Sequence, residues 1–205
     1  MIAKLAGVDA VITDPPYGVK LGENSASQKS SYASFDDTPE NVRTICVPII
    51  NSCRDRFARV VLTPGVKNMF LYDKPNHVGS FYYPSGAGCN SWGFSCWQPI
   101  FYYGKDPFGG KGSRPDSKES CEPSEKNGHP CPKPIGQTKW LVNRASLPNE
   151  TVFDPFMGSG TTGVACVTMD RNFVGCEVEP AYFDIACRRI EQAQRQGDLF
   201  IEAAA

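Results

Sequence analysis

The chain has 205 residues, a formal net charge of −1 at pH 7 and 40% hydrophobic residues. These values predict one globular domain with a sizeable core, and they exclude a strongly basic nucleic-acid-binding domain. Any contact with DNA would therefore depend on a local basic patch. No apolar run is long enough to span a membrane, and the first residues lack the pattern of a signal peptide, so we expect a cytoplasmic protein.

The nine cysteines are scattered along the chain, and none belongs to a C-x-x-C pair. Zinc sites usually contain two closely spaced pairs of ligands, so we expect no metal site. Several cysteines lie in apolar runs such as TGVACV and FDIACRRI. Such positions are typical of small buried hydrophobic residues in a reduced protein.

The first third of the chain predicts a strand, a helix and a second strand. Residues 10–13 (AVIT) read as a short apolar strand that ends at Asp14. Residues 38–57 have the apolar spacing of a helix, in which Pro48 predicts a kink. Residues 58–65 (ARVVLTPG) predict another buried strand followed by a breaker.

Residues 68–126 have a different composition, rich in glycine, serine, proline and aromatic residues. Within them, residues 99–106 predict a strand, and the polar stretch at 107–128 predicts an exposed loop. We expect the aromatic side chains that precede this strand to pack as a small core under the loop; these are Trp92, Phe94 and Trp97.

The last third alternates between helices and strands. Helices are predicted over residues 136–146, 159–170 and 179–196, and strands over residues 151–156 and 172–178. Strand–helix–strand order of this kind implies a parallel sheet with right-handed crossovers, and hence an α/β fold.

A glycine loop lies between the strand at 151–156 and the helix that follows it. It contains Gly158, Gly160 and Gly163 in the spacing G-x-G-x-x-G, and the next strand ends near Glu177. Such glycines let the backbone approach a nucleotide-like ligand, and the acid can accept hydrogen bonds from a ribose. The alternative is a tight strand–helix turn without a ligand. Because the loop comes late in the chain, the sheet would be permuted, and the strands at residues 10–13 and 59–63 would lie beside the glycine-loop strand. Such an order disfavours an NAD-dependent oxidoreductase.

Three motifs together resemble the amino-DNA methyltransferases, which use S-adenosylmethionine to methylate adenine N6 or cytosine N4. The motifs are DPPYG at 14–18, HPCPKP at 129–134 and FDPFMGSGTTGVA followed by GCEVEPAYFDIACRRI within 153–190. Their order resembles the β arrangement of that family. The segments VLTPG, WGFSCWQPIFYYGKDP and HPCPKP are similar to its small phage or prophage members. The resemblance implies a Rossmann-like S-adenosylmethionine-dependent methyltransferase fold with a mostly parallel sheet, permuted motif order and a mid-chain insertion.

The resemblance implies that residues 14–17 carry the chemistry. Asp14 and the backbone carbonyl of Pro15 would accept hydrogen bonds from the target amine and draw its delocalised lone pair toward attack. Pro15 and Pro16 would stiffen this backbone, because each fixes φ. Tyr17 would offer a flat face on which an extruded base can stack.

The cofactor-binding residues are likewise implied by the resemblance. Glu177 would bind the ribose hydroxyls, and Lys133 would face the methionine carboxylate or be an ordinary surface lysine. For His129 the motif indicates a helix-capping role and a functional role equally. The remaining residues of the expected S-adenosylmethionine pocket are Asp154, Phe156, Gly158, Ser159, Gly160 and Thr161.

Residues 1–205 would form a single catalytic domain, with a candidate target-recognition insertion at about 80–126. Basic side chains in or near that insertion would contact phosphates or belong to a solvated loop; they are Lys105, Lys111, Arg114, Lys118 and Lys126. We expect double-stranded DNA as the partner. The sequence leaves open whether the chain forms a homodimer and whether it is paired with a restriction enzyme. Localisation would be the cytoplasm of a bacterium or of an infected host cell.

Several functions compete. Adenine N6 is favoured over cytosine N4, because cytosine members of the family more often begin the motif with Ser than with Asp. A protein-amide methyltransferase is a weaker alternative, since its motif usually begins with Asn. A catalytically silent DNA-binding remnant of a prophage is disfavoured, because the acid motif and the glycine loop are both intact.

Overall fold

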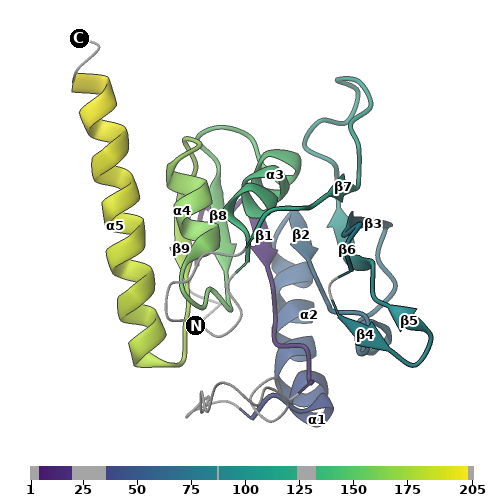
Figure 1. Ribbon diagram of the computed structural model, residues 1–205. Coiled ribbons are helices and arrows are strands. Elements are labelled where there is room, and N and C mark those ends of the chain that lie inside the picture. Colours follow the sequence, from purple (N-terminus) through teal and green to yellow (C-terminus); the bar gives the residue numbers. More distant parts are fainter. Residues whose placement is uncertain (1–4, 20–35, 87, 124–132, 203–205) are drawn as a thin grey trace.

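The computed structural model describes residues 5–19, 36–86, 88–123 and 133–202 (Figure 1). Within these residues a seven-stranded sheet has the order β7-β3-β6-β2-β1-β8-β9. The strands are β1 (Ala10–Thr13), β2 (Arg59–Leu62), β3 (His77–Tyr82), β6 (Trp97–Gly104), β7 (Lys118–Glu119), β8 (Thr151–Asp154) and β9 (Asn172–Gly175). A separate small hairpin consists of β4 (Cys89–Asn90) and β5 (Gly93–Phe94).

The helices flank this sheet. They are α1 (Pro39–Asn41), the π-helical turn η2 (Val42–Cys46), α2 (Val47–Arg56), the 3₁₀ turn η3 (Met69–Leu71), α3 (Ile135–Ala145), α4 (Thr161–Val167) and α5 (Pro180–Glu202). Figure 1 shows α5 as the outermost helix, beside α4. No helix in the described part of the chain is long and apolar enough to cross a membrane.

The sheet is mostly parallel, as the sequence predicts. β1 pairs in parallel with β2 on one side and with β8 on the other, and β8 pairs in parallel with β9. β6 is the exception, because it runs antiparallel to both β2 and β3. The acid strand β1, from the start of the chain, therefore lies directly beside the glycine-loop strand β8, from its last third. This adjacency is the permuted order that the late glycine loop predicts, whereas β2, also expected beside the glycine-loop strand, lies on the other side of β1.

Two hydrophobic cores cover the two faces of the sheet. On one face, α2 buries Ile50 and Cys53 against β1, β2, β6 and β8. On the other face, α3 and α4 bury side chains such as Val142 and Ala165 against the same strands. Successive residues of β1 alternate between the cores, with Val11 in the first and Ile12 in the second. Alternation of this kind follows from the two-residue period of a strand.

The helix predicted over residues 38–57 is interrupted by a π-helical turn rather than a simple kink. Thr38 caps its start, since its side chain accepts a hydrogen bond from the backbone N–H of Asn41. Val47 N–H donates to Val42, five residues back. Pro48 follows immediately and has no N–H of its own to donate. The wider turn before Pro48 lets the helix continue as α2 instead of breaking.

The middle of the chain differs from the prediction in two ways. Strand β3 was not predicted, because its sequence HVGSFY has little apolar alternation, and its position between β6 and the short outer strand β7 is set by pairing with both. The predicted aromatic core is wrong: Trp92 is 98% exposed and Phe94 is 73% exposed. Both lie on or between the short strands of the β4–β5 hairpin, which does not pair with the main sheet.

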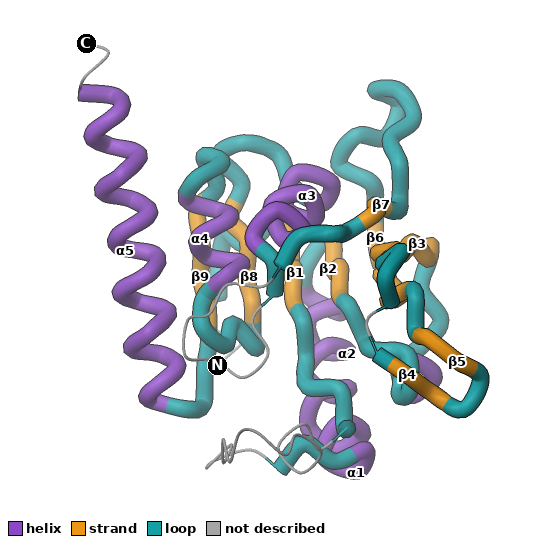
Figure 2. Tube along the Cα trace, viewed as in Figure 1, coloured by secondary structure: helices purple, strands orange, loops and turns teal. Residues whose placement is uncertain are grey.

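The antiparallel direction of β6 separates the two ends of the middle segment. Its last residue, Gly104, pairs with Arg59 at the amino end of β2, so the segment 105–117 leaves from that rim of the sheet. Its first residues, Trp97 and Gln98, extend past the Leu62–Phe101 pair toward the rim where β1 ends. Figure 2 shows the 105–117 loop and the β4–β5 hairpin at opposite ends of the sheet.

Candidate active site

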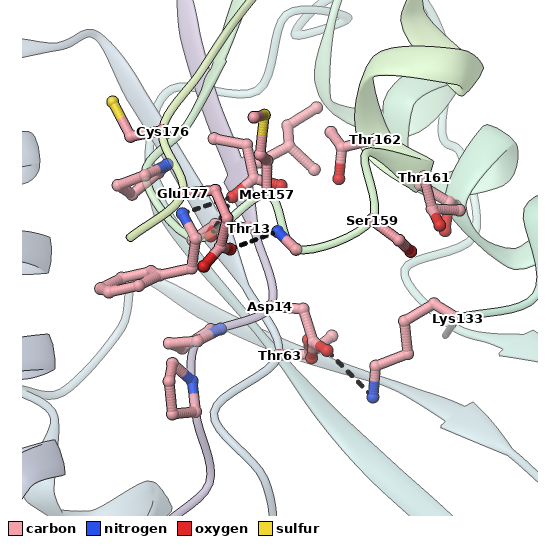
Figure 3. Close-up of a pocket in the computed structure, with 18 of the residues that line it drawn as sticks. Thr13, Asp14, Thr63, Lys133, Met157, Ser159, Thr161, Thr162, Cys176 and Glu177 are labelled. Atoms are coloured by element: carbon pink, nitrogen blue, oxygen red, sulfur yellow. Dashed lines mark hydrogen bonds and ion pairs between the residues drawn. The ribbon is translucent and has the colours of Figure 1, made fainter. Parts of the chain in front are cut away.

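The carboxylate of Asp14 lies directly after β1 and has three side-chain partners, two of them from distant parts of the chain. Thr63, which follows β2, donates its hydroxyl to Oδ1, and so does the hydroxyl of Tyr17. The Nζ of Lys133 lies 3.1 Å from Oδ2 (Figure 3). Parallel pairing of β1 with β2 brings Asp14 and Thr63 together, because the carboxyl ends of parallel strands share one rim.

The backbone after Asp14 is held by side chains from the neighbouring loops. Asp37 accepts hydrogen bonds from the backbone N–H groups of Gly18 (2.6 Å) and Val19 (3.2 Å). Asn68 Nδ2 donates to the carbonyl of Tyr17 at 2.6 Å. Gly18 has φ +69° and a Cβ there would lie 2.6 Å from the Asn68 amide, so glycine is required. The acid loop is therefore fixed from both sides of its turn.

Tyr17 is enclosed at its ring and at its hydroxyl. A Cβ added to Gly65 would lie 2.8 Å from a carbon of the Tyr17 ring, so the loop after β2 passes directly against it. The hydroxyl accepts a hydrogen bond from Lys133 Nζ at 2.6 Å and another from Gln98 Nε2. Burial, and then the negative charge of Asp14, hold the pKa of the Tyr17 phenol well above its usual value. Tyr17 is therefore a neutral hydrogen-bond donor to Asp14.

The glycine loop follows β8 and begins with a buried acid. Asp154 is 2% exposed, and its Oδ1 accepts hydrogen bonds from Thr13 Oγ1 (2.6 Å) and from the backbone N–H of Phe156 (3.0 Å). Burial raises the pKa of Asp154 to about 6, against the lowering effect of these hydrogen bonds. The carboxyl of Asp154 thus fixes the start of the loop and joins it to the end of β1.

Packing against α5 explains part of the glycine pattern. Gly160 has φ +78°, and a Cβ there would lie 2.8 Å from the Cβ of Ala186. A Cβ on Gly163 would lie 2.4 Å from Ile190. Arg189, also on α5, donates to the carbonyl of Ser159 and lies 3.3 Å from the hydroxyl of Thr161. These contacts show that two of the three glycines allow close approach of the last helix.

Glu177 lies after β9 with its carboxylate directed at the glycine loop. Its Oε2 accepts a hydrogen bond from the backbone N–H of Gly158 at 2.9 Å, and its Oε1 accepts one from the N–H of Glu179 at 2.9 Å. Each oxygen keeps lone-pair capacity for a further donor. The carboxylate is thereby held in a fixed orientation toward the cavity described next.

The acid loop and the glycine loop line one cavity of about 740 Å³. Figure 3 shows Asp14, Thr63 and Lys133 on one side of it and Glu177 and Met157 on another. All but one of the predicted site residues line this cavity, and the exception is Gly160. The predicted residues that line it are Asp14, Pro15, Pro16, Tyr17, Lys133, Asp154, Phe156, Gly158, Ser159, Thr161 and Glu177.

Lys133 lies on the acid side of the cavity. Besides its contacts with Asp14 and the Tyr17 hydroxyl, its Nζ is 4.6 Å from the centre of the Tyr17 ring. The expected role of Lys133 at a cofactor carboxylate stays a prediction. His129, predicted from the same motif, lies outside the described residues, as does Lys126.

Among the residues that sequence reasoning missed, two donate hydrogen bonds to the side chains of Asp14 and Tyr17. Thr63 follows a buried strand that is parallel to β1, so the strand-end rule that identified Asp14 could also have found it. Gln98 lies in β6, and nothing in the sequence near it points to Tyr17. Only the antiparallel pairing of β6 with β2 brings Gln98 to this rim.

The predicted basic side chains that the structure describes do not gather beside this cavity. Lys105, Lys111 and Arg114 belong to the segment that leaves from the opposite rim, where the Arg114 guanidinium lies 3.7 Å from the centre of the Phe108 ring. Lys118 lies in β7. Contact of these side chains with phosphates stays a prediction. Among the described residues, no group of three or more His, Cys, Asp or Glu side chains is arranged to hold a metal ion.

Comparison with known proteins gives short but clear sequence matches. The type II methyltransferase M2.MboI of Moraxella bovis is 38% identical over 64 residues, which are 31% of this chain and 23% of that protein. The type II methyltransferase M.Cfr9I of Citrobacter freundii is 52% identical over 47 residues, which are 23% of this chain and 16% of that protein. The matched segments thus span less than a quarter of the length of these relatives.

Solved structures match over nearly the whole fold. The complex of M1.HpyAVI with S-adenosylmethionine matches with a TM-score of 0.59 and 22% identity, covering 89% of this chain and 88% of that one. The cytosine-N4-specific PvuII DNA methyltransferase matches with a TM-score of 0.65 and 12% identity, covering 92% of this chain and 82% of that one. At these identities the likeness establishes the fold, and it confirms the predicted Rossmann-like methyltransferase architecture.

A family model of N6 and N4 methyltransferases, described as DNA methylase, matches residues 67–188. This range is more than half of the chain and includes the glycine loop and Glu177, whereas the acid loop at 14–18 precedes it. In the structure the acid loop lies beside the matched part, because β1 pairs with β8 and both loops line the same cavity. The chain belongs to the N6/N4 DNA methylase family.

Proposed function

We propose that the chain is a DNA methyltransferase that transfers a methyl group from S-adenosylmethionine to the exocyclic amine of a base extruded from double-stranded DNA. Adenine N6 is the favoured acceptor. The observation that carries this proposal is the single cavity of about 740 Å³ that both the acid loop and the glycine loop line. Methyl transfer requires a donor and an acceptor to meet in one water-poor space, and these loops lie far apart in the sequence.

The glycine-loop side of the cavity fits S-adenosylmethionine. Apolar side chains there, among them Phe156, Met157 and Val178, suit an adenine ring, and Glu177 has lone pairs for two ribose hydroxyls. The cavity volume lies in the range of about 300–1,000 Å³ typical of ligand pockets. When bound, S-adenosylmethionine supplies a methyl group on a positively charged sulfur. As the amine nitrogen takes this methyl group, the rest of the cofactor leaves as a neutral thioether.

The chain's own residues would align and polarise the amine. Asp14 would accept a hydrogen bond from one amine hydrogen and stabilise the positive charge that grows on nitrogen, and the carbonyl of Pro15 would accept a hydrogen bond from the other. After transfer, the methylated nitrogen would lose one proton through Asp14 to solvent. Alignment of two reactants in this way supplies about 7–11 kcal/mol in favourable cases. Thr63, Lys133 and Tyr17 hold the Asp14 carboxylate in place, and one of these contacts gives way to the amine.

Lys133 would act at the acid rather than at the cofactor. Its ammonium group is 3.1 Å from Asp14 Oδ2 and holds that carboxylate oxygen by charge attraction. A carboxylate held in one orientation is the better acceptor for a hydrogen bond from the amine. The contact with a methionine carboxylate that the family motif suggests is the alternative role of Lys133.

Adenine N6 is favoured because the motif begins with Asp14, a family tendency rather than a chemical necessity. Cytosine N4 is the alternative, and the similar PvuII enzyme is specific for that atom. Both amines are aromatic, and both would present two hydrogens to the same acceptors. A homodimer and the use of residues 80–126 in target recognition stay predictions.

The test is incubation of the wild-type chain with methyl-labelled S-adenosylmethionine and DNA of mixed sequence, followed by digestion to nucleosides. N6-methyldeoxyadenosine supports the proposal as stated, and N4-methyldeoxycytidine supports the alternative. Label in protein instead of DNA would indicate an amide methyltransferase, and DNA binding without any transfer would indicate a silent remnant. Calorimetry should detect binding of S-adenosylmethionine and none of NAD, and the reverse would favour an oxidoreductase.

A further inference from the structure

A chain of hydrogen bonds runs through largely buried side chains from α3 to the acid loop. Gln137 Nε2 donates to the hydroxyl of Tyr83 (3.1 Å), and Tyr83 donates to Gln98 Oε1 (2.9 Å). Gln98 Nε2 then donates to the hydroxyl of Tyr17, which donates to Asp14. We refer to these five residues as the polar chain. It connects three separate elements of the fold to the catalytic acid.

The burial of the two amides is unusual unless they have a task. Gln98 is 8% exposed and Gln137 is 3% exposed. A buried amide costs free energy unless its groups are hydrogen-bonded, and an apolar side chain would serve the hydrophobic core better. Gln98 lies in a strand between apolar neighbours such as Ile100. A leucine or valine would suit this position in the strand, yet the residue is a glutamine whose amide donates a hydrogen bond to Tyr17.

The polar chain has one direction of donation. Tyr83 has a single hydroxyl hydrogen, and Gln98 Oε1 at 2.9 Å is nearer to it than Gln137 Oε1 at 3.4 Å. The Gln98 oxygen therefore faces Tyr83, and its NH₂ group faces Tyr17. The Tyr17 oxygen accepts from both Gln98 and Lys133. With both acceptor positions filled, its own hydrogen is left for Asp14.

We propose that Gln98 is a positioning residue that fixes the ring and hydroxyl of Tyr17 for the incoming base, with Tyr83 as its anchor. Gly65 holds the ring and Gln98 holds the hydroxyl, so the aromatic face cannot turn without breaking one of these contacts. This inference rests on the proposed function, in which the base stacks on Tyr17. Gln98 acts through Tyr17, and its loss should affect the DNA end of the site and not the cofactor end.

The first test is a double-mutant cycle with Gln98→Leu and Tyr17→Phe. We expect Gln98→Leu to lower kcat/KM for DNA about tenfold (about 1.4 kcal/mol, the scale of a hydrogen bond to a buried group) and to leave the Kd of S-adenosylmethionine within about twofold. In the Tyr17→Phe background, which lacks the hydroxyl, the same change should cost less than about twofold. Gln98→Glu, which keeps the size but cannot donate to Tyr17, should resemble Gln98→Leu.

The matched control is Tyr102→Phe, which removes a hydroxyl from the same strand but from the opposite rim, where it donates to the carbonyl of Asp116. It should leave kcat/KM unchanged. A Gln98→Leu effect that persists undiminished beside Tyr17→Phe, or a parallel loss of cofactor affinity, would mean that Gln98 only supports packing and would overturn the inference. No transfer by the wild-type chain would instead overturn the proposed function.

The second test does not depend on activity. Carbon-13 spectra of protein labelled at tyrosine Cζ report the hydrogen bonds of each phenol, and Tyr17→Phe identifies the Tyr17 resonance. We expect Gln98→Leu and Tyr83→Phe to move that resonance and Tyr102→Phe to leave it in place. An unmoved Tyr17 resonance in Gln98→Leu would overturn the inference, whether or not the chain methylates DNA.

Discussion

Asp154 makes the stability of the apo protein depend on pH in an unusual direction. Its carboxyl is 2% exposed and its pKa is about 6, against about 3.9 in an unfolded chain. Between these values the native state binds more protons than the unfolded state. The free energy of unfolding contributed by Asp154 is therefore fully present below about pH 4 and is lost as the pH rises through about 6.

The magnitude follows from the shift. One pKa unit corresponds to about 1.4 kcal/mol, so between pH 4.5 and pH 7.5 Asp154 should cost the protein roughly 2 kcal/mol. Asp154→Asn keeps an oxygen that can accept from Thr13 and from the Phe156 N–H but cannot ionise. Relative to this variant, the wild type should lose roughly 2 kcal/mol of stability over that pH range.

Urea unfolding of both proteins at the two pH values, without cofactor, measures this difference. Asp184→Asn, at an exposed position of α5, controls for the substitution itself. A wild-type minus variant difference that is the same at both pH values would refute the reasoning. A difference of opposite sign would mean that the hydrogen bonds to Asp154 outweigh its burial and hold it ionised.

Three further predictions concern substitutions at Gly65, Lys133 and Gly160. Gly65 has φ +69°, and Gly65→Ala would place a methyl group 2.8 Å from the Tyr17 ring. Because the ring would then be displaced, kcat should fall about 100-fold while the Kd of S-adenosylmethionine stays unchanged. An unchanged kcat would contradict the close packing of Gly65 against Tyr17. Because Lys133 pairs with Asp14, Lys133→Met should reduce kcat at least about tenfold and change the Kd of S-adenosylmethionine less than about twofold. A weaker affinity for S-adenosylmethionine with an unchanged kcat would show that Lys133 binds the cofactor instead. Gly160→Ala should lower the free energy of unfolding by about 2 kcal/mol or more, from its positive φ and its contact with α5, and a thermal melt equal to wild type would exclude this.

The strands that carry the site could be predicted because each is short, apolar and ends in a chemically distinctive residue. AVIT before Asp14 and TVF before Asp154 became β1 and β8, and the late position of the glycine loop predicted that they pair. Motif spacing also brought Glu177 to the glycine loop. These are local patterns, and the parallel-sheet rule converts them into positions on one rim.

The features that escaped prediction depend on contacts between distant segments. Gln98 reaches Tyr17 only because β6 reverses direction, and strand direction is not encoded in the local pattern WQPIFYYG. The same reversal sends Lys105 and Arg114 to the opposite rim. Gly160 matched a ligand-binding spacing, yet its nearest neighbour is α5. Trp92 was predicted to lie in a core because aromatic residues are usually buried, whereas its side chain is 98% exposed on the β4–β5 hairpin.

The central claim is that Asp14 acts on the acceptor while a separate loop of the same cavity holds the donor. The most direct measurement compares wild type with Asp14→Ala in two assays, calorimetric binding of S-adenosylmethionine and transfer of labelled methyl to DNA. Cofactor affinity within about twofold of wild type, together with loss of transfer by at least about 100-fold, is the predicted result. Loss of cofactor binding in parallel with transfer would contradict the claim, because Asp14 would then be supporting the structure of the cavity instead of the reaction.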